Sequence, residues 1–154
     1  MTVEKSYVIF GTEVVDVIVS SATSKGQFSV LVETVQPGFG PPPHKHTHED
    51  ELFVPIEGTF EMFDGAVWHP LTKTGHHCPR GLVHTFRNAG ADPGQLMVTT
   101  PGSNFDTFLE KLIPLEMPQD MQKLIDISAE HGITYILPEA PEQKADAAEH
   151  MAVA

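Results

Sequence analysis

The sequence has a single cysteine and few basic residues. With Cys78 alone, no disulfide can form inside the chain, and a reducing compartment such as the cytoplasm is expected. Lysine and arginine number 9 against 21 aspartates and glutamates, which gives a formal net charge of −12. Because nucleic acids and anionic membranes bind basic surfaces, this charge argues against both as partners.

Long apolar runs are also lacking. Residues 1–5 carry no apolar core of the kind that a secretory signal needs, and no segment approaches the length of a membrane span. We therefore expect a soluble cytoplasmic protein. Proline and glycine, at 13 and 12 residues, are plentiful, which favours short strands and tight turns over long helices. The 154 residues are expected to form one domain, 1–154, whose core needs no disulfide.

Alternating apolar residues predict many short β-strands. Strands are expected over residues 7–10, 13–19, 28–36, 52–56, 59–64, 66–69, 82–87 and 95–100. Segment 28–36 is apolar on both faces, which indicates a central strand. Asp64 followed by Gly65 predicts a hairpin turn.

The pattern changes after Pro101 and Gly102, where helical spacing replaces alternation. Ser103 is a suitable N-cap for the first helix, and Gly132 is well placed to end the second. Helices are expected over about 105–113 and 118–132, a short strand over 133–137 and a frayed tail over 139–154.

Possible metal ligands are concentrated in residues 44–51, His-Lys-His-Thr-His-Glu-Asp-Glu. His44 and His46 are two apart on an extended segment, so both imidazoles point to the same face. Glu51 can reach the same point if the chain bends between them. A distant strand is expected to add His84, because the turn at Pro79 fixes where that strand begins. Such a set suits Fe, Mn, Ni, Cu or Zn far better than Ca or Mg.

Both stretches resemble the two motifs of the cupin family. The first matches Gly-x5-His-x-His-x4-Glu-x6-Gly and the second matches Pro-x-Gly-x2-His-x3-Asn. The matching residues are Gly38, His44, His46, Glu51, Gly58, Pro79, Gly81, His84 and Asn88. The resemblance implies a single-domain cupin, with a small antiparallel β-barrel or jelly roll over about 28–100 and helices over about 103–132. It also implies one divalent transition metal ion held by His44, His46, Glu51 and His84.

Two positions depart from the family's pattern. The second motif usually opens with glycine six residues before its proline, where this chain has Lys73. We therefore expect a rebuilt turn near His76 and His77. Pro55 stands where the family usually has a β-branched strand residue. Because proline has no N–H, a ladder bond should be lost there or a bulge should be present.

The other histidines and the cysteine have simpler interpretations. His48 is two residues after His46, so on an extended segment it would point to the same face as His44 and His46. The resemblance to the family nevertheless implies that it is a rim residue. His69, His76 and His77 are expected to be surface or structural residues. Cys78 is expected to be a small packing residue, since no activating partner is visible in the sequence.

Inward-facing side chains of a small barrel also line its pocket. We expect an apolar substrate pocket suited to an aromatic molecule and lined by Phe39, Phe53, Met62, Trp68, Phe86, Met97 and Phe105. The first helix is most simply an amphipathic cover.

Three functions are compatible with these residues. A single barrel followed by a Phe/Leu helix resembles small quercetinase-like cupins, which implies a dioxygenase whose metal binds a substrate oxygen and O2 while catalytic Glu51 doubles as the base. A non-oxidative isomerase or cyclase would use the same ligands, and a non-catalytic small-molecule-binding cupin is the third interpretation. Barrels of this kind often pair through N-terminal strands, and the apolar segment 13–19 therefore indicates a homodimer.

Overall fold

The computed structural model describes residues 2–138 and is built mainly of β-strands. The strands are β1 (Lys5–Ile9), β2 (Glu13–Val19), β3 (Phe28–Val35), β4 (His44–His46), β5 (Glu51–Glu57), β6 (Phe60–Phe63), β7 (Trp68–Leu71), β8 (His76–Cys78), β9 (Thr85–Asn88), β10 (Gly94–Pro101) and β11 (Ile133–Tyr135). The helices are α1 (Phe105–Glu110) and α2 (Met121–Glu130). The tail expected to fray, 139–154, lies outside the described residues.

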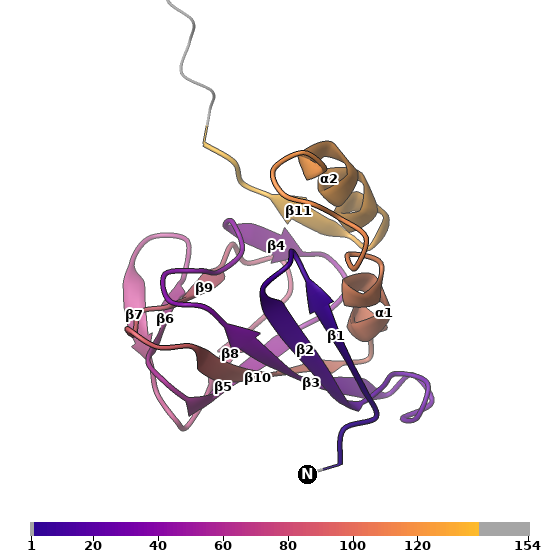
Figure 1. The fold of residues 1–154 in the computed structure, drawn as a ribbon, viewed down its shortest axis with the longest axis horizontal. Coiled ribbons are helices and arrows are strands. Elements are labelled where there is room, and N and C mark those ends of the chain that lie inside the picture. The colour runs from indigo at the N-terminus through magenta and orange to yellow at the C-terminus, as the bar shows by residue number, and fades with distance from the viewer. Residues whose placement is uncertain (1, 139–154) are drawn as a thin grey trace, which may run out of the picture.

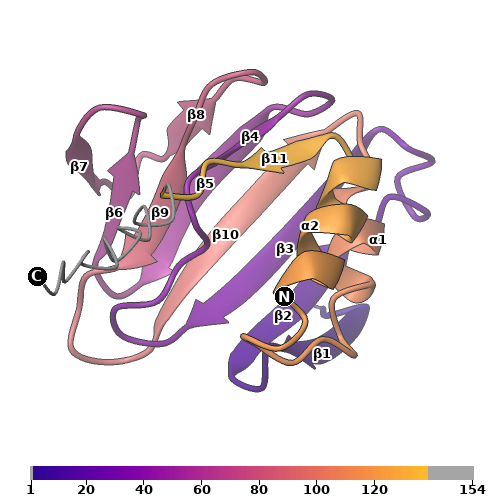
Figure 2. The same cartoon turned by 90° about the horizontal axis from the view of Figure 1, so that it is seen from above.

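Two antiparallel sheets form the body of the protein (Figures 1 and 2). The larger has six strands in the order β1-β2-β3-β10-β5-β8, and the smaller has the order β7-β6-β9. A third pair, β11-β4, lies at one end. This arrangement confirms the expected antiparallel jelly roll. The two larger sheets do not join into one closed ring of strands, so the fold is an open jelly roll.

Alternation places the core between the sheets. The side chains of Leu31 and Val35 on β3 point inward and are almost fully buried. The side chains of Leu96 and Val98 on β10 do the same. β3 pairs with β2 on one side and with β10 on the other. Its predicted central position is confirmed.

The N-terminal strands extend the larger sheet. β2 lies between β1 and β3, so segment 13–19 is not the apolar edge that the sequence suggested. The edge strand on this side is β1, which adds five paired residues outside β2. A dimer through the N-terminal strands would therefore form at β1.

Pro55 coincides with an irregularity of the sheet. β5 pairs with β10 at Pro55 opposite Leu96, and the register then shifts so that Glu57 lies opposite Gln95. Two steps along β5 thus correspond to one step along β10, which is a β-bulge. The expected bulge at this proline is confirmed.

The C-terminal segment folds back over one end of the sheets (Figure 2). The first helix is shorter than expected, and its N-cap is Asn104, whereas the Ser103 hydroxyl accepts the Phe105 N–H at 3.2 Å. The second helix begins at Met121, later than expected. Gly132, with φ of +73°, ends it as predicted. No helix among residues 2–138 is long and apolar enough to cross a membrane.

The side chain of Asn88 ties three backbone segments together, which generates a first prediction. It is fully buried, donates to the carbonyls of Val35 and Asp92 at 2.8 and 2.9 Å, and accepts the Gly90 N–H at 2.8 Å. Asn88→Ala should lower the free energy of unfolding by about 2–4 kcal/mol, because three backbone groups, one of them fully buried, lose their partner. Chemical denaturation measures this change. Asn104→Ala, at an exposed asparagine, is the control, and an equal loss in both variants would contradict the assignment.

Candidate metal centre

Four possible metal ligands meet inside the jelly roll. His44 and His46 lie on β4, Glu51 begins β5, and His84 precedes β9. All four side chains are buried, between 2% and 7% exposed. One ligand atom from each lies within 4.8 Å of the others. The structure thus brings together the four residues that the sequence singled out, in a group that could hold a metal ion.

Backbone hydrogen bonds bring the two motifs into contact. The N–H of His44 donates to the carbonyl of His84 at 2.9 Å, and the N–H of His84 returns the bond at 2.8 Å. Gly81, in the turn of the second motif, donates its N–H to the carbonyl of His46 at 2.7 Å. These bonds fix the register of the two segments, so both sets of imidazoles face the same point.

The approach to β4 depends on a glycine. A Cβ atom at Gly40 would overlap the backbone carbonyl of Phe86. The absence of a side chain lets the chain pass against β9 before it turns into Pro41 and Pro42. The carbonyl of Pro41 accepts the Thr85 hydroxyl at 2.5 Å. The proline segment is thereby held beside the strand that carries the second motif.

The hydrogen bonds of the three imidazoles test whether a metal ion fits. The Nδ1 atoms of His44 and His84 lie 2.8 and 3.2 Å from the carbonyls of Pro42 and Leu82. A carbonyl only accepts, so each Nδ1 carries the proton and the Nε2 atom is left as the one that can bind a cation. His84 Nε2 lies 2.7 Å from a carboxylate oxygen of Glu51. His46 Nδ1 lies 2.6 Å from a carboxylate oxygen of Glu49, and its buried Nε2 has no hydrogen-bond partner. Outward-anchored Nδ1 atoms with converging Nε2 atoms are the arrangement that metal-binding histidines show.

Burial and mutual charge set the ionisation of the group. Burial is the main cause that lowers the pKa of His44, to about 4, so this imidazole is neutral and able to bind a cation near pH 7. Burial also opposes the charged form of His46, but the carboxylates of Glu51 and Glu49 outweigh it and raise its pKa. For Glu51, burial is again opposed, here by His46 and His84, and the pKa is lowered. The carboxylate is ionised.

Glu49 is a site residue that sequence reasoning missed. It is buried, and its carboxylate accepts the Nδ1 proton of His46. This orients the ring and makes it a better ligand. Glu49 was hidden because it stands in a run of acids, next to the exposed His48 and two residues before Glu51. Its position three residues after His46 was the only available signal.

The remaining histidines lie outside the centre. His48 is exposed, and its ring packs against Gly132. His69 pairs with Asp64 at 2.6 Å and His77 pairs with Asp50 at 3.1 Å, both at the surface. His76 is half-buried on β8.

Cys78 is buried beside the sulfur of Met62, at 3.9 Å. Burial, with a smaller effect of Glu51, raises the pKa of its thiol to about 12. Such a thiol stays protonated and is a poor nucleophile.

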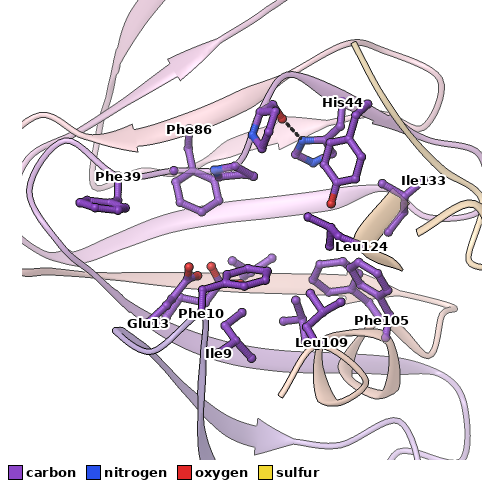
Figure 3. Close-up of a pocket in the computed structure, with 18 of the residues that line it drawn as sticks. Ile9, Phe10, Glu13, Phe39, His44, Phe86, Phe105, Leu109, Leu124 and Ile133 are labelled. Atoms are coloured by element: carbon purple, nitrogen blue, oxygen red, sulfur yellow. Dashed lines mark hydrogen bonds between the residues drawn. The ribbon is translucent and has the colours of Figure 1, made fainter. Parts of the chain in front are cut away.

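A cavity of about 410 Å³ opens beside the metal ligands (Figure 3). Its wall includes His44, His46 and Glu51, and is otherwise mainly apolar. Four of the seven predicted lining residues are part of it: Phe39, Phe53, Phe86 and Phe105.

Three predicted lining residues lie elsewhere, which corrects the sequence interpretation. Met62 is buried in the core on β6, against Cys78. Trp68 is 38% exposed on β7, with the guanidinium of Arg87 4.0 Å from its ring centre. Met97 alternates with the inward-facing residues of β10 and therefore faces the other side of the sheet.

The C-terminal segment contributes more of the cavity wall than expected. Side chains of α1, α2, β11 and the loop between the helices line it: Phe105, Phe108, Leu109, Leu112, Met117, Met121, Leu124, Ile133 and Tyr135. β11 pairs with β4, and the ring of Tyr135 lies 5.9 Å from that of His44. The helices are therefore part of the site and not only an amphipathic cover.

Two further carboxyl groups line the cavity, those of Glu13 and Glu33. They are hydrogen-bonded to each other, and burial is the main cause that raises the pKa of both. Sequence reasoning missed them, because Glu33 is a single acid in an apolar strand and Glu13 begins another strand, so each looks like an ordinary outward-facing residue.

Comparisons with known proteins agree with this architecture. Residues 31–100 match the family model described as "Cupin domain". No curated protein matches the chain. The fold is shared with KdgF from a Halomonas species (TM-score 0.57, 12% identity, 68% of this chain and 93% of that one). It is also shared with the polyketide cyclase RemF from Streptomyces resistomycificus (TM-score 0.55, 16% identity, 64% of this chain and 74% of that one).

A third structure is described as a sugar phosphate isomerase from a cupin superfamily, from Silicibacter pomeroyi (TM-score 0.53, 21% identity). The match covers 61% of this chain and 62% of that one, so it spans less than two thirds of that protein. At these identities the likeness concerns the fold. The match of residues 31–100 and the shared fold make this chain similar to proteins of the cupin superfamily.

Replacement of His84 tests the ligand set. His84→Ala should weaken binding of Zn(II) or Mn(II) by more than the 10- to 100-fold that loss of a ligand's hydrogen-bond partner typically costs. His48→Ala is the matched control, since this exposed histidine belongs to the same His-x-His-x-His run. Metal titration followed by elemental analysis gives both affinities. Full metal occupancy in His84→Ala, or an equal loss in His48→Ala, would overturn the assignment.

Replacement of Glu49 tests its part in orienting His46. Glu49→Ala should weaken metal binding by about 10- to 100-fold, because the imidazole loses the group that fixes its tautomer. Glu49→Gln should lose less, since its amide oxygen can still accept the Nδ1 proton. Isothermal titration with Zn(II) distinguishes the variants. Glu130→Gln, at an exposed acid of α2, should bind like the wild type. Wild-type affinity in Glu49→Ala would sink the proposed role.

Proposed function

We propose that this cupin-fold protein is a metal-dependent enzyme that acts on a small phenolic or enolisable substrate, and that its reaction is a dioxygenation. The observation that carries the proposal is the placement of two outward-anchored imidazoles and one ionised carboxylate in the wall of an apolar cavity, with the third imidazole, that of His84, in contact with the carboxylate. Such a cavity with a few convergent polar groups is typical of a small-molecule site.

His44, His46, Glu51 and His84 would hold one divalent transition metal ion. The donor set of three nitrogens and one oxygen suits Fe, Mn, Ni, Cu or Zn. When bound, such an ion supplies a Lewis acid and, for a redox-active metal, a partner for O2.

Glu51 is the residue that we assign to proton transfer. It lines the cavity, and the imidazoles of His46 and His84 keep its buried carboxylate ionised. One of its oxygens lies 2.7 Å from His84 Nε2 and 3.2 Å from His46 Nε2. A carboxylate held in this position can accept the proton of an enol or phenol that enters the cavity.

The apolar wall selects and shields the substrate. Phe53, Phe86 and Phe105 present ring faces and edges to the cavity, as expected for an aromatic ligand. Helices α1 and α2 cover the end of the sheets and exclude water, which strengthens electrostatic interactions at the ligands.

A non-oxidative isomerase or cyclase is the second candidate. The Glu13–Glu33 carboxyl pair favours it, because an acid that keeps its proton in the same cavity could return a proton to a substrate after Glu51 has removed one. A cyclase and an isomerase are among the proteins that share the fold. We keep this reaction as the alternative.

Association into a homodimer is also a proposal. The exposed edge of the larger sheet is β1, and Val8 on this strand is exposed. Pairing of two β1 edges would cover unpaired backbone groups.

Oxygen uptake by the metal-loaded protein tests the reaction. With a panel of flavonols, diketones and catechols, the wild type should consume O2 in step with substrate loss. Glu51→Gln should turn over about 100- to 10,000-fold more slowly at equal metal occupancy, because the amide cannot act as a base. Glu57→Gln, an exposed glutamate at the end of the same strand, should keep the wild-type rate. An oxygen electrode and chromatography of the substrate provide the measurements.

Other outcomes would change the assignment. Turnover in the absence of O2 would favour the isomerase or cyclase. Tight binding of substrate without turnover would make the protein a binding cupin. An unchanged rate in Glu51→Gln would remove this residue as the base.

A further inference from the structure

We propose that Glu13 and Glu33 form a recognition site for a neutral hydroxyl group of the substrate, in the same cavity as the metal ligands. This inference rests on the proposed function and adds a class of substrate to it. The ligand would be an aromatic alcohol with one oxygen for the metal end and a second, uncharged hydroxyl for the carboxyl pair.

Sheet register places both carboxyl groups on the cavity side. Glu33 of β3 lies opposite Val15 of β2, and Glu13 is two residues before Val15 on the same strand. Residues two apart on a strand share a face, so both side chains point to the side on which Val15 is fully buried. Figure 3 shows Glu13 beside Phe10, on a different part of the wall from His44.

Burial leaves Glu33 dependent on its partner. The side chain is 5% exposed, and its neighbours on the same face of β3, Leu31 and Val35, are fully apolar. The carboxyl group of Glu13 is its hydrogen-bond partner among residues 2–138. A hydrogen bond between two carboxyl groups requires that one of them keeps a proton. Burial is the main cause that raises the pKa of Glu33, and the charges of Glu13 and Glu51 act in the same direction.

A comparison with Asp106 shows what is unusual about the pair. Asp106 is also buried, and one of its carboxylate oxygens accepts the backbone N–H of Ser21 at 3.0 Å. This is a structural use of a buried acid, since it fastens a loop. The carboxyl groups of Glu13 and Glu33 have no such side-chain bond to the backbone of residues 2–138, and they line the cavity that also contains the possible metal ligands. The remaining oxygens of the pair are therefore available to a ligand that enters the cavity.

The shared proton decides which ligands fit. Such a pair has an O–H to donate and carboxylate oxygens to accept with, which matches a hydroxyl group that does both. It carries about one negative charge, and no residue that lines the cavity is lysine or arginine. A carboxylate or phosphate on the substrate would meet this charge without a counter-ion at a low dielectric constant. The site should therefore favour a neutral hydroxylated aromatic and disfavour anionic substrates.

Binding of three related naphthalenes to the Zn(II)-loaded protein tests the inference. Wild type should bind 2,6-dihydroxynaphthalene about tenfold tighter than 2-naphthol, as expected for one added hydrogen-bonded group. It should bind 6-hydroxy-2-naphthalenesulfonate more weakly than either, because a sulfonate is a poor metal ligand and its charge would meet the carboxyl pair. Glu33→Leu should remove the preference for the diol over 2-naphthol. Asp16→Leu, at a carboxylate on the other face of β2, should keep the preference.

A second variant tests whether the charge of the pair disfavours anionic ligands. It also provides a test if Glu33→Leu does not fold. The double variant Glu13→Gln, Glu33→Gln keeps the shape of both side chains and removes the charge. It should raise the affinity for 6-hydroxy-2-naphthalenesulfonate relative to the diol by at least about tenfold. An unchanged ratio would overturn the inference. So would equal affinities for the diol and 2-naphthol in wild type, no binding of either, or a preference for the diol that survives in Glu33→Leu.

The same titrations separate this inference from the proposed function. The role of the carboxyl pair is measured by the ratio of the affinities for the diol and for 2-naphthol, both determined on the same protein. The role of the metal is measured by the affinity of 2-naphthol with and without Zn(II). If Zn(II) does not change the affinity for 2-naphthol but the diol is still preferred over 2-naphthol, only the proposed function is contradicted. If Glu33→Leu changes the effect of Zn(II) on the affinity for 2-naphthol, the carboxyl pair does not act separately from the metal.

Discussion

The backbone pairing of His44 with His84 is the constraint on which the site depends. Each residue donates its N–H to the other's carbonyl, so two segments that are distant in the sequence have one fixed register. The bond from Gly81 to the His46 carbonyl extends the same contact. A buried cluster of three imidazoles and a carboxylate is costly to assemble, because each group loses water. The hydrogen-bonded backbone holds them together whether or not a cation is bound.

The other edge of β4 is also paired, and this links the site to the C-terminus. β11 runs antiparallel to β4, with further bonds from Thr47 to Gly132 and from Ile136 to Pro43. The strand that carries two ligands is thus held from both sides. The same pairing carries Tyr135 and the helices to the cavity, so the C-terminal segment borders both the possible metal ligands and the cavity.

Local patterns were sufficient for some features and insufficient for others. Spacing on an extended segment and the two motifs identified the four possible ligands. Which face of a strand a residue occupies relative to its near neighbours, and where a turn lies, are short-range properties of the sequence. The bulge at Pro55 followed from its missing N–H. Trp68 and Met97 were placed in the pocket wrongly, since apolar character does not indicate which face of a sheet a residue occupies. Glu33 was missed for the same reason.

The sequence by itself determined an antiparallel β-fold and the set of side chains that can bind a metal ion. Both depend on alternation, turns and spacing, which are written locally in the chain. Tertiary structure alone decided that Glu49 orients His46, that β11 and the helices wall the cavity, and that Glu13 meets Glu33. These features depend on which strands become neighbours. Strand order and register arise from the packing of the whole chain.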